Sequence, residues 1–148
     1  MFHGSAALNL DAKGRMTIPA RHRDALAGPG NGRLIITSHP HQCLLLFPEA
    51  AWEATRNVLL AASGIEPRAA NMRRMMLGMA DEAEIDAAGR VLIGPVLRDF
   101  AKLEKEIYLV GLGDHFEIWS AQGWMAELQK FASSGSEPPP QGLEHLPL

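Results

Sequence analysis

The pattern of apolar and polar positions divides the chain into short strands and short helices. Four mostly apolar runs are typical of buried strands, and they cover residues 34–37, 43–47, 107–110 and 116–119. Pro19 and Pro95 predict the starts of two short helices, because proline fits the first helical turn. Three longer helices are predicted from Pro48 to about Ala61, from Glu66 to Met79, and from Ala121 to about Phe131.

An internal repeat is the most informative feature of the sequence. The segment Leu10–Ile18 lines up with Ile85–Ile93, at an offset of 75 positions. Further matches are Arg23-Asp24 with Arg98-Asp99 at the same offset, and Phe47 and Trp52 with Trp119 and Trp124 at an offset of 72. The first copy has a slightly longer loop at residues 28–32, which explains the change of offset. Matches in the same order along the chain predict a duplicated structural unit.

Each copy contains an Asp-x-x-Gly turn, at Asp11–Gly14 and at Asp86–Gly89. The carboxylate can accept hydrogen bonds from the backbone two residues on, and glycine tolerates the last turn position. Apolar alternation on both sides of each turn predicts a hairpin. Each copy is therefore expected to run strand, turn, strand, helix, strand, strand. The expected division is a first repeat at 5–50, a linking helical segment at 51–78, a second repeat at 79–122, and a C-terminal helix with a disordered tail at 123–148.

The charge of the chain is distributed unevenly. The net charge of −3 alone argues mildly against nucleic acid as a partner. Residues 1–74, however, hold nine Lys/Arg against five Asp/Glu, whereas the remainder holds five against twelve. DNA binding depends on the local field of a surface patch, so the basic leading half can bind phosphate while the acidic half faces elsewhere.

The chain shows no sign of export or membrane insertion in its sequence. The opening residues lack the basic start and apolar run of a signal peptide, and no run approaches the roughly 20 apolar residues of a membrane span. Cys43 is the only cysteine, which excludes an internal disulfide. We therefore expect a cytoplasmic protein that needs no cofactor and has no membrane partner.

Arginines on the two turns are the strongest candidates for function. Arg15 and Arg90 each follow an Asp-x-x-Gly turn, which fixes the direction in which they project. Guanidinium groups suit both phosphate and the O6/N7 edge of guanine. The other candidate DNA-binding residues are Lys13 in the first turn and Arg21 and Arg23 on the helix that follows, while Asp11, Gly14, Asp86 and Gly89 are expected to form the turns.

With these motifs, the sequence resembles the MraZ family of transcriptional regulators. The resemblance covers about residues 1–130 and rests on Met1-Phe2-x-Gly4, Asn9 to Arg15, Ile18-Pro19, Cys43 to Pro48 with Trp52, Arg73-Arg74 ahead of Leu77-Gly78, and Asp86 to Arg90. Two departures stand out. His3 occupies a position where many members carry arginine, and Ala88 replaces the counterpart of Lys13, so the second copy is expected to contact DNA more weakly.

The resemblance implies an α+β fold, mainly a β swapped-hairpin barrel of the AbrB-like kind formed by the two tandem repeats, with short flanking helices. It also implies a ring-shaped homo-oligomer that associates with the nucleoid. Its expected partner is double-stranded DNA, at short direct repeats upstream of the division and cell-wall gene cluster that includes its own gene. Asp11 with Arg15 and Asp86 with Arg90 correspond to the DNA-contacting motifs of the family. No small-molecule substrate is implied.

Several alternatives stay open at this point. An AbrB-like antitoxin would clasp a toxin, although the tail lacks long apolar anchors. Gly4-Ser5 near a strand resembles the processing site of self-cleaving decarboxylases, an argument from fold analogy alone. His39-Pro40-His41 could begin a metal site, but no third ligand is evident nearby in the sequence, so no metal site is predicted. The acidic residues 81, 82, 84 and 86 are more typical of a solvated edge than of a catalytic pair.

Overall fold

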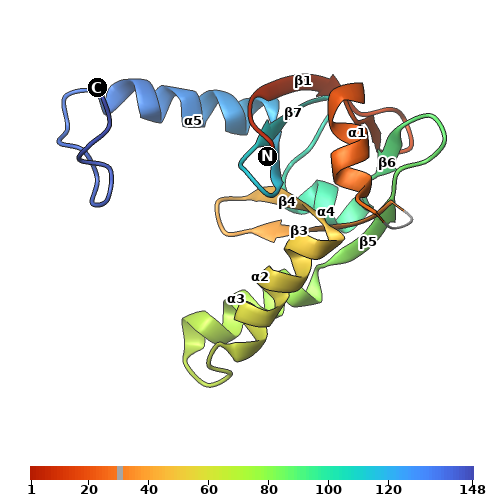
Figure 1. Cartoon of the computed structure of the whole chain (residues 1–148), viewed down its shortest axis with the longest axis horizontal. Coiled ribbons are helices and arrows are strands. Elements are labelled where there is room, and N and C mark those ends of the chain that lie inside the picture. The colour runs from red at the N-terminus through yellow and green to blue at the C-terminus, as the bar shows by residue number, and fades with distance from the viewer. Residues whose placement is uncertain (30–31) are drawn as a thin grey trace.

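The computed structural model describes residues 1–29 and 32–148, and it contains short strands and helices in nearly the predicted order (Figure 1). The elements are β1 (Ser5–Asn9), β2 (Arg15–Thr17), α1 (Ala20–Ala27), β3 (Arg33–His39), β4 (Cys43–Pro48), α2 (Glu49–Ala61), α3 (Pro67–Gly78), β5 (Asp81–Glu84), β6 (Arg90–Leu92), α4 (Pro95–Phe100), β7 (Glu106–Gly111), β8 (Phe116–Ser120) and α5 (Ala121–Ser133). The loop predicted at 28–32 includes residues 30 and 31, which lie outside the described residues.

Local signals account for several helix boundaries. Helix α1 follows Pro19 and ends at Gly28, whose φ of 65° is unfavourable for residues with a side chain. The Glu66 side chain accepts from the N–H groups of Arg68 and Ala69, which caps the start of α3 next to Pro67. The start of α1 after Pro19 and that of α4 at Pro95 confirm the two helix starts predicted from proline.

Strands of the two repeats are mixed in the larger sheet. The six-stranded order is β1-β7-β8-β4-β3-β5, and all its pairs are antiparallel. Strand β1 of the first repeat pairs with β7 of the second, and β5 of the second pairs with β3 of the first. Strands β2 and β6, one from each repeat, form a separate two-stranded sheet, here called the ribbon. The two repeats therefore fold as one interlocked unit.

The predicted hairpins were wrong in their pairing, although the turns are correct. The strands on either side of the Asp11–Gly14 turn, β1 and β2, pair with β7 and β6 of the other repeat and not with each other. Alternation of apolar residues specifies which face of a strand is buried, but it does not specify the partner strand. Within the described residues, β1 and β5 are the two edge strands of the larger sheet and do not pair with each other. The closed barrel expected from the sequence is therefore not seen as an unbroken ring of paired strands.

One face of the larger sheet carries a core shared by both repeats. Its fully buried residues include Met16 and Val91 from the ribbon and Leu26 and Leu97 from helices α1 and α4. These side chains pack on alternate residues of the sheet, including Leu44 and Ile118 of the two central strands. A core built equally from both copies leaves neither copy able to bury its apolar surface alone.

The opposite face of the sheet is covered by the remaining helices. Helices α2 and α3 form an antiparallel arm that projects from the β3–β4 side (Figure 1). The arm packs through Trp52, Leu59 and Met76. The hydroxyl groups of Thr37 and Ser38 donate to the carbonyls of Met76 and Met75, which fixes the end of α3 on the sheet.

Helix α5 packs through Trp124 and extends away from the sheet (Figure 1). Among the described helices, none has the length and apolar character needed to span a bilayer.

The C-terminal tail expected from the sequence lies outside the helices and strands of the fold. Helix α5 ends at Ser133, and the remaining residues form isolated turns, such as Glu137 N–H to the Ser134 carbonyl. All residues after Ser134 are exposed. That the tail is disordered stays a prediction.

Deleting residues 135–148 should leave folding unchanged, because no buried contact is lost and surface changes usually alter stability by only about 0.5 kcal/mol. Thermal unfolding and size-exclusion chromatography of the full and shortened chains would check this. A smaller particle after the deletion would show that Leu143, Leu146 or Leu148, all exposed in a single chain, dock on another copy.

Candidate nucleic-acid interface

The ribbon presents arginines of both repeats on one face. Arg15 pairs with Leu92 and Thr17 pairs with Arg90, so all four side chains point to the same side of the antiparallel pair. The intervening Met16–Val91 pair points inward and is fully buried. Thr17 and Leu92 are exposed, and 54% of the surface of Leu92 remains accessible. The arrangement gives one outward surface with an arginine near each end.

Each arginine is oriented by the aspartate of its own turn. The Asp11 Oδ1 atom accepts from the N–H groups of Lys13 and Arg15, at 3.0 and 2.9 Å, and Oδ2 accepts from the Arg15 Nε at 2.7 Å. Gly14 N–H donates to the Asp11 carbonyl at 3.0 Å, which closes the predicted turn. Because only the Nε of Arg15 is used, its two terminal nitrogens can still donate to a ligand.

The second turn repeats this geometry almost bond for bond. Asp86 Oδ1 accepts from the N–H groups of Ala88 and Arg90, at 2.9 and 2.8 Å, and Oδ2 accepts from the Arg90 Nε at 2.9 Å. Both aspartates therefore act as the predicted turn-forming acceptors. The same hydrogen bonds lower the pKa of both carboxyl groups, that of Asp11 to about 2, with the bond from the backbone N–H of the arginine as the largest cause in each.

Each turn is also held by an arginine of the other repeat. A Cβ added to Gly89 would lie 2.4 Å from Arg23 Cζ, and one added to Gly14 would lie 2.6 Å from Arg98 Nε. Both arginines donate through Nε to a carbonyl of their own repeat, Arg23 to Ile18 at 2.8 Å and Arg98 to Ile93 at 2.9 Å. The planar guanidinium groups thus cover the two turn glycines reciprocally. We call this pair of contacts the arginine clamps.

Backbone bonds reinforce the arginine clamps. Ile18 N–H donates to the Gly89 carbonyl at 2.8 Å, and Ile93 N–H donates to the Gly14 carbonyl at 2.9 Å. The turn of one repeat is therefore fixed to the strand end of the other on both sides of the ribbon. Sequence reasoning assigned Arg23 to DNA and did not assign a role to Arg98. Arg23 and Arg98 are aligned at the offset of 75, and this alignment could have indicated that they play equivalent roles in the two repeats.

The remaining predicted cations of the first repeat are exposed, one of them in the first turn. Lys13 lies in the turn itself, and Arg21 lies on α1. Their counterparts at the same offset in the second repeat are Ala88 and Val96, which carry no charge. The first repeat thus supplies more cations than the second. Thr17 and Leu92 were missed as candidates, although their spacing of two from Arg15 and Arg90 places them on the same strand face.

The acidic residues of β5 adjoin one end of the ribbon, because Asp81, Glu82 and Glu84 line a surface pocket together with Leu92. Asp81, Glu82 and Glu84 are exposed on β5, at one edge of the larger sheet. Charged side chains on an edge strand disfavour pairing with another chain. The location agrees with the solvated edge expected from the sequence.

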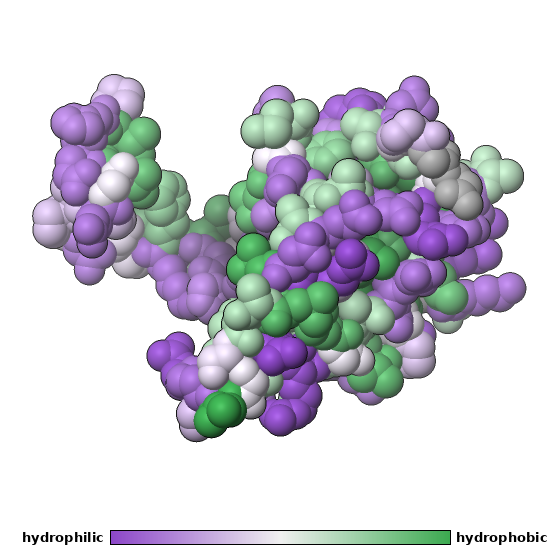
Figure 2. All heavy atoms as spheres, turned by 60° about the horizontal axis from the view of Figure 1, so that its bottom comes forward, coloured by the Kyte–Doolittle hydropathy of each residue, from purple (hydrophilic) through white to green (hydrophobic). Residues whose placement is uncertain are grey.

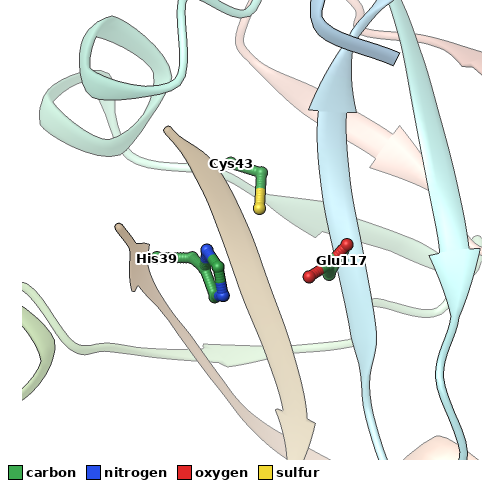
Figure 3. Close-up of side chains that lie close together, drawn as sticks. All are labelled: His39, Cys43 and Glu117. Carbon is green, nitrogen blue, oxygen red and sulfur yellow. The ribbon is translucent and has the colours of Figure 1, made fainter. Parts of the chain in front are cut away.

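The structure corrects the reasoning on His39. The sequence shows no third ligand close to His39 and His41, but Cys43 and Glu117 lie next to His39 in space, and ligand atoms of these three residues are within 4.8 Å of one another (Figure 3). Glu117 comes from the second repeat, which explains why local sequence spacing did not indicate it.

Comparisons with known proteins identify relatives over the whole chain. Residues 1–75 and 76–143 each match the family described as "MraZ protein, putative antitoxin-like". A protein of Dechloromonas aromatica named transcriptional regulator MraZ is 56% identical over 141 residues, which cover 94% of this chain and 95% of the relative. Proteins of the same name from Methylobacillus flagellatus and Aromatoleum aromaticum are 47% and 49% identical over the full length of both chains.

Alanine at Gly89 should destabilise the fold more than alanine at Gly113. Both glycines have positive φ, 80° and 89°, so each substitution costs about 1–2 kcal/mol in backbone strain. Only at Gly89 must an arginine also move, because the nearest atom at Gly113 is 3.7 Å away. Denaturant unfolding of both variants measures the difference. Adding Arg23→Ala to Gly89→Ala should remove the excess loss, and equal losses in the two single variants would contradict the arginine clamp.

The Asp11 carboxyl should titrate near pH 2 in the folded chain. This pKa lies below the ordinary value of 3.8, so the ionised carboxylate stabilises the folded chain at pH values above 3.8. Its contribution to the stability of the fold is lost as the pH falls from 3.8 toward 2. Carbon-detected NMR titration of the side-chain carboxyl measures the value. Arg15→Ala should raise the pKa only part of the way, because the backbone N–H bond remains. A complete return to the ordinary value would show that the side-chain contact dominates.

Proposed function

The chain belongs to the MraZ family, and on this premise we propose that it is a sequence-specific DNA-binding transcriptional regulator whose ribbon contacts base edges. The observation that carries the proposal is the placement of Arg15 and Arg90 on one outward face, each oriented by its own aspartate. The names of its relatives as transcriptional regulators support the function class. No catalytic step is proposed.

The shape of the ribbon fits the major groove. A two-stranded antiparallel pair is one of the elements that the major groove of B-DNA admits. Arginine can contact guanine O6 and N7 through two nitrogens, and the terminal nitrogens of Arg15 and Arg90 are the ones that their aspartates do not engage. Between them, Thr17 offers a hydroxyl and a methyl group, and the exposed Leu92 can contact a thymine methyl.

Lys13 and Arg21 are proposed as phosphate contacts. Lys13 is exposed in the first turn and Arg21 is exposed on α1, and both lie outside the strands of the ribbon. Phosphate contacts position a protein on the duplex without reading its sequence. Arg23 is proposed to contribute through its terminal nitrogens while its Nε holds the Ile18 carbonyl. The second repeat has neither Lys13 nor Arg21 in equivalent form, so it is proposed to bind more weakly.

The target and assembly follow from the family resemblance. We propose that the operator consists of short direct repeats upstream of the division and cell-wall gene cluster, including the gene for this protein. Successive subunits of a ring-shaped homo-oligomer on the nucleoid would each read one repeat. Apolar side chains interrupt the hydrophilic surface on the side of the helical arm (Figure 2), and they support self-association. The exposed apolar residues of the arm and of α5 include Val58, Leu60, Ile65, Met72, Met75, Met125, Leu128 and Phe131.

The fold is proposed to be a swapped-hairpin barrel of the AbrB-like kind. The exchange of β1 and β5 between repeats and the mixed ribbon support this assignment. In this view each repeat plays the part of one subunit of a dimer, and the pair of repeats forms a single DNA-binding unit.

Arg15→Ala should abolish specific binding at moderate salt. A lost guanine contact costs about 1–3 kcal/mol per site, and several subunits bound to successive repeats multiply the effect. Thermal stability should hardly change, because the exposed Arg15–Asp11 ion pair contributes little. Titration of a duplex carrying the region upstream of the gene, and of a scrambled duplex, at several salt concentrations separates base reading from phosphate contact. Each lost phosphate contact lowers the salt slope by about 0.9.

Two comparison variants make this test specific. Arg90→Ala should weaken binding less, since its turn carries Ala88 where the first turn carries Lys13. Arg74→Ala on α3 removes an equal charge away from the ribbon and should leave affinity within a few-fold. Unchanged affinity in the Arg15 variant would exclude the ribbon as the contact surface. A larger defect from Arg90→Ala would reverse the ranking of the repeats.

A further inference from the structure

Three side chains with metal-binding atoms meet on the face of the larger sheet opposite the ribbon. His39 ends β3 and is paired with Cys43 at the start of β4, while Glu117 of β8 is paired with Leu45 of β4. Alternation along β4 places Cys43 and Leu45 on one face, so Cys43, His39 and Glu117 all point to that face. Figure 3 shows the imidazole, the thiol and the carboxylate directed toward a common space.

The separations of these groups are close to those of a tetrahedral site. Their ligand atoms lie within 4.8 Å of one another. Ligands around zinc at about 2.0–2.3 Å are separated by roughly 3.3–3.7 Å, so rotamer changes that bring the atoms about 1 Å closer would complete the geometry. The three residues come from two hairpins that are joined by the central β4–β8 pair, which limits how far they can separate.

We propose that His39, Cys43 and Glu117 bind a divalent transition-metal ion of the zinc type, with water in the fourth position. Thiolate and imidazole ligands select borderline ions such as Zn²⁺ or Co²⁺ over Mg²⁺ and Ca²⁺, which prefer oxygen ligands alone. The proposal does not depend on DNA binding. It concerns the other face of the sheet and requires none of the ribbon residues.

Neighbouring residues orient one of the three ligands and leave another open to solvent. Glu117 Oε1 accepts from the Trp119 Nε1 at 2.9 Å, which orients the carboxylate. His39 also lines a surface pocket of about 550 Å³ between β3 and α3, together with Met72 and Met75, so an ion can reach the imidazole from solvent.

Binding requires two local changes. Burial and the Glu117 carboxylate raise the pKa of the Cys43 thiol, so the metal displaces a proton from sulfur and releases it to solvent. His41 N–H donates to His39 Nδ1 at 3.0 Å without metal. When His39 ligates, Nδ1 either binds the ion or carries the proton, so this hydrogen bond must open. The backbone amide of His41 is therefore a reporter placed next to the site.

A bound ion would connect the two repeats. His39 and Cys43 belong to the first repeat and Glu117 to the second, across the central strands of the interlocked sheet. The free energy of binding would add to the stability of this arrangement, because the unfolded chain does not hold the three ligands together. We infer that metal raises the unfolding temperature of the regulator.

The test titrates Co²⁺ into the full-length, untagged protein and follows its absorption. One equivalent per chain should give a thiolate-to-cobalt charge-transfer band and the visible bands of a tetrahedral site, and Zn²⁺ should displace it. Cys43→Ala should abolish the charge-transfer band, while His39→Ala and Glu117→Gln should each weaken affinity at least about tenfold. The His41 amide signal should shift on Zn²⁺ addition.

His41→Ala is the matched control, since His41 is exposed two residues from His39 and should not be needed. Glu117→Gln keeps the size of the side chain and tests the site even if Cys43→Ala does not fold. Absence of a charge-transfer band in the wild-type protein overturns the proposal. Equal losses from His39→Ala and His41→Ala would do the same, because they would place binding on the exposed loop.

Discussion

The pairing of strands between the two repeats is the constraint on which the rest of the structure depends. The buried Met16–Val91 pair at the centre of the ribbon and the β4–β8 pair at the centre of the larger sheet each join one repeat to the other. Because the shared core takes side chains from both copies, neither repeat has a complete hydrophobic core without its partner. Joining two such units in one chain replaces a dimerisation step, so the interlocked state does not depend on protein concentration.

The same pairing creates the candidate DNA-binding surface. The ribbon places Arg15 and Arg90 on one face because β2 and β6 belong to different repeats and pair with each other. The arginine clamps then fix each turn from the opposite repeat, through Arg23 over Gly89 and Arg98 over Gly14. Side chains held in one orientation lose less conformational entropy when they bind a ligand. The rigidity of the ribbon therefore depends on contacts between the two repeats and cannot be predicted from either turn sequence alone.

The helices, the buried strands and the turns could be predicted from the sequence, but the pairing of the strands could not. Proline positions and apolar runs predicted the helix starts and the buried strands, since these depend on local physical chemistry. The Asp11 turn followed from residue types for the same reason. The hairpin pairing was wrong because an alternating strand fits any neighbour with a matching face. Arg98 and Glu117 went unassigned because their roles arise from contacts with the other repeat.

Divergence between the repeats follows from this geometry. The turn aspartate, the turn glycine and the clamping arginine are each present in both copies. Lys13 and Arg21 are exposed and contribute nothing to the core, and their counterparts are Ala88 and Val96. Substitution at such exposed positions changes stability little, so the surface charge of the two copies could diverge without loss of the fold. The result is a nearly symmetric scaffold in which the first repeat carries more cations than the second.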